Sequence, residues 1–125
     1  MKFIDAPNTP AAVGPYSKAV ACGDLLFCSG QIPLDPSTME VVGTAIEDQT
    51  RQVMKNITAL LDGAGIGLDK IIKTTVFLSS MEDFAGMNAV YEEMLEGHKP
   101  ARSAVEVARL PKDVLVEIEC ICALN

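Results

Sequence analysis

The sequence predicts one domain in which two helices lie against one face of a β-sheet, in the order strand–strand–helix–strand–helix–strand–strand. Three observations predict it: a length of 125 residues, several alternating apolar runs, and two longer runs with helical spacing. A chain of this size buries about two thirds of its unfolded surface, which suits one core spanning residues 1–125. With 49% hydrophobic residues, the face without helices should pack against other copies of the chain.

The first half of the chain predicts a hairpin followed by a helix. Alternation on both sides of Gly23 and Asp24 indicates a tight turn into a strand over residues 25–31. Thr44 and Glu47 have the spacing of a capping box, which predicts a helix over residues 45–62. Glycines directly after that helix indicate its C-cap and a loop.

The second half predicts a strand, a helix and a final pair of strands. The β-branched run at residues 70–79 indicates a strand. Ser79 and Glu82 form a second capping box, opening a helix that ends near residue 96 before a glycine. Asn88 falls within the apolar stripe of this helix, so its amide needs hydrogen-bonding partners.

Residues 102–108 and 114–123 are the predicted last strands. In the strand over residues 102–108, alternation predicts that one set of side chains faces the core: Ser103, Val105 and Val107. If the apolar faces of both strands coincide, four charged residues share the opposite face: Arg102, Glu106, Glu117 and Glu119. Such a group is either an ordinary surface ion pair, contributing about 0.5 kcal/mol, or part of a dry crevice between subunits. In a crevice, Arg102 suits a substrate carboxylate, with charged hydrogen bonds of about 1.5–3 kcal/mol.

Composition argues against several classes of function. The chain has 17 acidic and 10 basic residues, a net charge of −7, so nucleic acid is not an expected partner. It has neither an apolar run of about 18 residues, as a membrane span requires, nor a signal-peptide pattern, so a cytoplasmic location is expected. One histidine and four cysteines without a CxxC pair predict no metal site, and the cysteines are expected to pack in the core.

Several segments resemble the Rid family (reactive intermediate deaminase, YjgF-type). They are "GPYS" from Gly14, "SGQIP" from Ser29, "KTTVFL" from Lys73 with "DF" and Asn88 after it, and "PARSAVEVARLPKDVLVEIE" from Pro100. The resemblance covers nearly the whole chain, and its most specific part joins Pro-Ala-Arg to Val-Glu-Ile.

The resemblance implies a chorismate-mutase-like α+β fold, a homotrimer, and ligand clefts between subunits. It also implies hydrolysis of 2-imino acids, such as 2-iminobutanoate and 2-iminopropanoate, to 2-keto acids and ammonia, without a metal or organic cofactor. Arg102 is implied to hold the substrate carboxylate, Glu117 to position or deprotonate water, and Tyr16 to close the cleft. The remaining implied contacts are Ser29, Gly30, Gln31, Asn88 and Ala104.

Two departures from the family pattern concern the cleft. Ala104 stands where many deaminases have cysteine, although its backbone carbonyl can still serve. The segment before Arg102 is short, and Lys99 occupies a position where an aromatic residue is common. Two other functions stay open: a trimeric sensor that binds 2-keto acids or small carboxylates with little turnover, and an RNA-directed translation inhibitor or ribonuclease.

Overall fold

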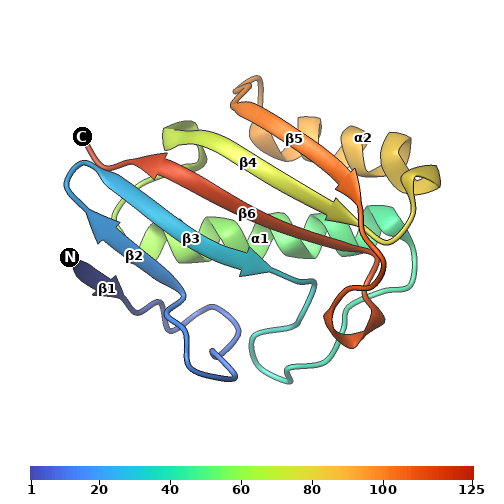
Figure 1. Cartoon of the computed structure of the whole chain (residues 1–125), viewed down its shortest axis with the longest axis horizontal. Coiled ribbons are helices and arrows are strands. Elements are labelled where there is room, and N and C mark those ends of the chain that lie inside the picture. Colours follow the sequence, from blue (N-terminus) through green and yellow to red (C-terminus); the bar gives the residue numbers. More distant parts are fainter.

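The computed structural model describes all residues, 1–125, and contains a six-stranded sheet and two helices (Figure 1). The strands are β1 Lys2–Ile4, β2 Ala19–Cys22, β3 Leu25–Gln31, β4 Ile71–Leu78, β5 Ala101–Glu106 and β6 Val116–Ala123. The helices are α1 Ile46–Gly63 and α2 Phe84–Leu95, with short 3₁₀ turns η1 Leu68–Lys70, η2 Met81–Asp83 and η3 Pro111–Asp113.

The sheet is mixed, with strand order β1-β2-β3-β6-β4-β5. All neighbours are antiparallel except β4 and β5, which run parallel because α2 returns the chain between them. Gly23 makes the β2–β3 turn with a φ of 60°, a conformation that glycine adopts without steric cost. The predicted α+β order is confirmed, with β1 as an additional strand that the sequence did not reveal.

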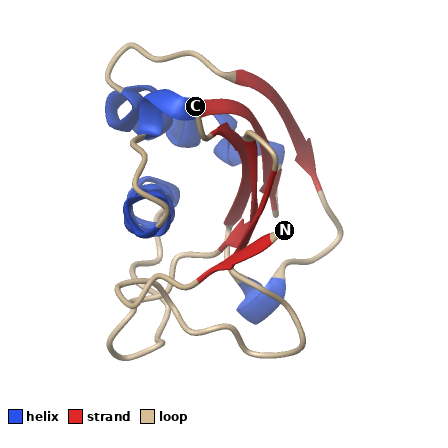
Figure 2. Cartoon of the chain, turned by 90° about the vertical axis from the view of Figure 1, so that its left-hand side faces the viewer, coloured by secondary structure: helices blue, strands red, loops and turns tan.

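Both helices lie against the same face of the curved sheet (Figure 2). The core fills this layer with buried side chains from α1, α2 and the central strands, among them Val53, Leu60, Leu61, Val76, Leu78, Met87, Ile118 and Cys122. The opposite face carries exposed apolar side chains, including Phe3, Phe27 and Val105. Neither helix is long and apolar enough to cross a membrane.

The helix starts differ from the predicted capping boxes. At α1 the N-cap is Ala45, which provides no side-chain cap, so the prediction for Thr44 is wrong. Before α2, Ser80 caps η2 by accepting the backbone N–H of Glu82 at 3.2 Å. Ser79 does not cap: it directly follows β4, and its N–H donates to the Leu115 carbonyl just before β6.

Candidate functional site

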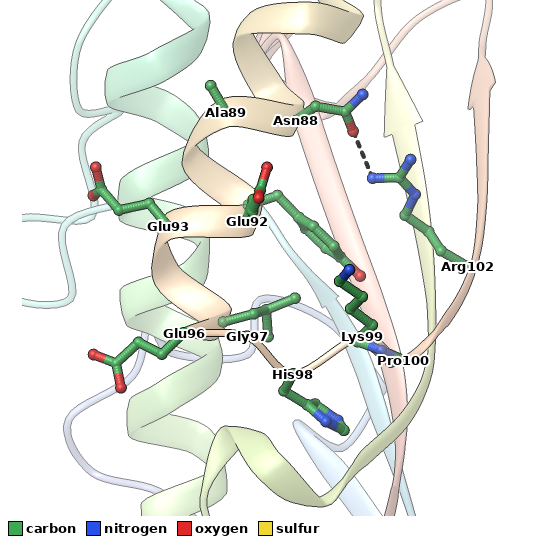
Figure 3. Close-up of a pocket in the computed structure, with 12 residues that line it drawn as sticks. Asn88, Ala89, Glu92, Glu93, Glu96, Gly97, His98, Lys99, Pro100 and Arg102 are labelled. Atoms are coloured by element: carbon green, nitrogen blue, oxygen red, sulfur yellow. Dashed lines mark hydrogen bonds between the residues drawn. The ribbon is translucent and has the colours of Figure 1, made fainter.

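Arg102 lies near the start of β5 with its side chain directed towards α2. Its Nη1 donates to Asn88 Oδ1 at 2.6 Å (Figure 3). The guanidinium carbon lies 5.4 Å from the centre of the Phe84 ring and 5.1 Å from that of Tyr91. Both distances are within cation–π range, so three α2 residues hold the guanidinium in one orientation.

Tyr91 is itself held in place by the sheet. Its hydroxyl shares a 2.7 Å hydrogen bond with Thr74 on β4, and both residues are buried. Burial raises the pKa of the Tyr91 phenol, although the Thr74 bond and the nearby Arg102 charge act in the opposite direction. The phenol is therefore a neutral support for Arg102 at neutral pH.

Arg102 lines a depression beside α2, and a second depression contains most of the other predicted site residues. Tyr16, Ser29, Gly30, Gln31 and Glu117 all line it. The Ser29 hydroxyl donates to the Ser17 carbonyl at 2.6 Å, which fixes its oxygen as an acceptor at the wall. Tyr16 is 53% exposed, so its phenol is free at the rim to meet a ligand or a neighbouring molecule.

Glu117 on β6 packs directly over Gly30. A Cβ built at position 30 would lie 2.9 Å from the Glu117 carboxyl carbon, so only glycine leaves room for this carboxylate. Burial raises the pKa of Glu117, and the negative charge of Glu119 raises it further. A carboxylate with a raised pKa is a stronger proton acceptor than an ordinary glutamate.

The predicted sharing of one face by Arg102, Glu106, Glu117 and Glu119 is wrong. Thr74 of β4 pairs with both Arg102 and Cys120, and all three face the helices, because directly paired residues share a face. Glu117 pairs with Phe77, three residues along β4, and therefore lies on the opposite face. Arg102 and Glu117 of one chain cannot meet across the sheet.

The error came from the apolar residues of β5. Val105, predicted to face the core, is 43% exposed on the open face, whereas Ala104 packs against the core. Glu106 shares the helix-facing side of β5, and its carboxylate accepts the Met81 N–H at 2.9 Å. Of the four charged residues, Glu117 and Glu119 line the second depression, and Arg102 lines the one beside α2.

The structure also adds residues that the sequence did not single out. Phe84 and Tyr91 lie on α2 with Asn88, and their rings support the guanidinium. Their spacing of seven residues on one helix face was the available signal. Cys22 is exposed, contrary to the predicted core packing of all four cysteines, whereas the other three are buried.

Residues 6–124 match the family model described as Endoribonuclease L-PSP. The chain is 48% identical over 123 residues to the Escherichia coli protein named 2-iminobutanoate/2-iminopropanoate deaminase, covering 96% of this chain and 95% of that protein. The same identity and coverage hold for the deaminase of that name from Salmonella typhimurium. The chain belongs to the Rid family.

Other members of the Rid family bear less specific names or are known as solved structures. RutC family protein PH0854 of Pyrococcus horikoshii is 58% identical, over 96% of this chain and 95% of that one. The solved YjgF gene product of E. coli has a TM-score of 0.95 and 46% identity, with full coverage of both chains. E. coli TdcF, solved with bound serine, has a TM-score of 0.95 and 42% identity, also with full coverage.

The two depressions offer complementary chemistry. The depression beside α2 provides a rigid cation that suits a planar carboxylate. The depression at Gly30 provides a carboxylate base, a phenol and a serine oxygen. Within one chain the sheet separates them, so a ligand that touches both must lie between two copies.

Proposed function

We propose that this protein hydrolyses 2-imino acids, such as 2-iminobutanoate and 2-iminopropanoate, to 2-keto acids and ammonia. Two relatives at 48% identity carry the name of this activity. A relative of the same fold was solved with bound serine, an amino acid with the carboxylate that a 2-imino acid also has. In the reaction one water adds to the C=N carbon, and the nitrogen leaves as ammonia.

The observation that carries the proposal is the separation of Arg102 from Glu117 by the sheet. Each residue lies in a depression that is polar but incomplete for this reaction. We place the active site where the Arg102 depression of one copy meets the Glu117 depression of the next, within a homotrimer. Phe3, Phe27 and Val105, exposed on the open face, support this arrangement, because association would cover their apolar surface.

In this shared cleft, Arg102 binds the substrate carboxylate and Asn88 keeps the guanidinium in place. Glu117 of the neighbouring copy orients the water and removes its proton, a role that contributes about 10²–10⁴-fold. A protonated imine is already electrophilic, so orientation and one base suffice for the addition. Tyr16 closes the cleft, and its remaining contacts come from Ser29, Gly30, Gln31 and the backbone carbonyl of Ala104.

Two other functions have an observation in their favour. The serine bound to TdcF supports a sensor that binds small carboxylates with little turnover. The description of the family model supports a ribonuclease. A net charge of −7 opposes the second, because RNA binding depends on a basic surface.

An imine-decay assay separates these functions. 2-Iminobutanoate is generated in situ from an amino acid, and its disappearance is followed with wild type, Arg102→Ala and Arg109→Ala. We expect acceleration by wild type and Arg109→Ala, and none by Arg102→Ala. Binding of 2-ketobutanoate without acceleration would indicate the sensor, and RNA cleavage that survives Arg102→Ala and Glu117→Ala would indicate the ribonuclease.

A further inference from the structure

Glu119 lies in the same depression as Glu117 and has no ionic partner in its own chain. The two carboxylates are two residues apart on β6 and share the open face of the sheet. Glu119 takes part in none of the chain's three ion pairs. Its negative charge is close enough to raise the pKa of Glu117. A second, uncommitted carboxylate therefore faces any ligand that Glu117 meets.

A β-bulge in β3 places Glu119 beside the polar wall of this depression. The register of β3 against β6 shifts between Cys28 and Gln31. Ser29 and Gly30 therefore oppose Glu119 together, two residues against one. Bulges of this kind redirect side chains next to active sites, so the position of Glu119 is part of the same local architecture as the rest of the depression.

The two lysines that line the depression are held by backbone carbonyls. Lys18 Nζ donates to the Ala6 carbonyl at 3.0 Å, and Lys112 Nζ donates to the Met39 carbonyl at 3.4 Å. Neither forms an ion pair with a carboxylate of the depression. The negative charge of Glu119 is therefore available to a positively charged group of a ligand.

We propose that Glu119 binds the positively charged nitrogen of the ligand, while Glu117 orients the water. The inference rests on the proposed function, because a protonated 2-imino acid carries a carboxylate and, on the adjacent carbon, an iminium group with N–H donors. Arg102 of the neighbouring copy binds the carboxylate, and Glu119 accepts a charge-assisted hydrogen bond from the iminium.

The spacing of the two glutamates suits this division of roles. Alternate residues of a strand lie about 7 Å apart, which leaves room for a water and the C=N group between their carboxylates. A carboxylate beside the nitrogen also favours its protonated form, and the protonated imine is the form that water attacks.

The same pair of charges occurs in a 2-amino acid, whereas a 2-keto acid has an uncharged oxygen in place of the nitrogen. Isothermal titration calorimetry with 2-aminobutanoate and 2-ketobutanoate therefore isolates the contact made by Glu119. We expect Glu119→Gln to weaken 2-aminobutanoate binding by about tenfold or more and to leave 2-ketobutanoate binding within about twofold. Glu82→Gln removes the same charge from an exposed position outside both depressions and should change neither affinity.

Three results would overturn the role of Glu119 and leave the proposed hydrolysis standing. They are equal weakening of both ligands in Glu119→Gln, as loss of a subunit contact would cause; selective loss of 2-aminobutanoate in Glu117→Gln alone; and wild type that binds only 2-ketobutanoate. Wild type that binds neither ligand would overturn the proposed function and this inference together. Selective loss in Glu119→Gln, with no imine decay by wild type, would support the nitrogen contact and contradict the hydrolysis.

Discussion

Replacing Arg102 with lysine tests whether the geometry of the guanidinium, and not only its charge, is required. Lysine keeps the positive charge but has a single nitrogen in place of the planar fork. In the structure Nη1 is engaged by Asn88 at 2.6 Å, and the aromatic rings of α2 hold the plane. One ammonium nitrogen lacks the planar pair of donors that can bind both oxygens of a carboxylate while another N–H stays with Asn88.

The expected loss is one charged hydrogen bond, worth about 1.5–3 kcal/mol. That free energy corresponds to a decrease in kcat/KM of about 10- to 150-fold. The assay is the decay of 2-iminobutanoate at several substrate concentrations, with thermal unfolding measured in parallel to show that the variant folds.

Arg109→Lys is the matched control, because Arg109 forms an exposed ion pair with Asp113 at 2.7 Å and lies outside both depressions. We expect its kcat/KM to stay within about twofold of wild type, since exposed ion pairs contribute little. A kcat/KM for Arg102→Lys close to wild type, or an equal loss in Arg109→Lys, would refute the role assigned to the guanidinium.

Three further changes have defined outcomes. Glu117→Gln should lower kcat by about 10²-fold or more. It should also raise the melting temperature, because burial and Glu119 raise the pKa of Glu117, so that its ionised form destabilises the fold. A pH series of melting curves checks this gain in stability, which should be largest above the raised folded-state pKa and vanish below the unfolded-state pKa. Gly30→Ala should displace the Glu117 carboxylate and remove most activity with little change in melting temperature. Tyr91→Phe should cost about 1 kcal/mol of stability, because the buried Thr74 hydroxyl loses its partner; an unchanged melting temperature would contradict this reasoning.

The sequence predicted the bounds of those elements whose local pattern agrees with the way they pack. β3 matches its predicted range, and α1 lies within one residue of it, because alternation and helical spacing there coincide with burial on one face. β1 was missed because three residues give too little alternation to recognise. β6 begins at Val116, two residues later than predicted, because its pairing with β4 begins at the Leu78–Val116 pair.

The sequence did not predict which face of the sheet each site residue lies on, because both faces of this sheet carry apolar side chains. Valines on β5 indicated the core face, but β5 is an edge strand whose valine at position 105 lies on the open side. A shift of one residue in the assignment of a face moves every side chain to the other side. The motifs therefore identified Arg102 and Glu117 as candidate site residues. Only the strand register showed that they lie on opposite faces of the sheet.

The grouping of three buried thiols, from Cys28, Cys120 and Cys122, also could not be predicted from the sequence. Cys28 is distant in sequence from Cys120 and Cys122, and no spacing rule relates them. Their convergence depends on the antiparallel register of β3 against β6.

Subunit complementation tests the shared cleft most directly. Arg102→Ala and Glu117→Ala, each of which we expect to be inactive alone, are unfolded, mixed in equal amounts and refolded, and native mass spectrometry verifies that mixed trimers form. If each cleft takes Arg102 from one copy and Glu117 from the next, about one quarter of the clefts are intact, and imine hydrolysis should recover to about one quarter of the wild-type rate. Mixed trimers without any recovery of activity would contradict the shared cleft.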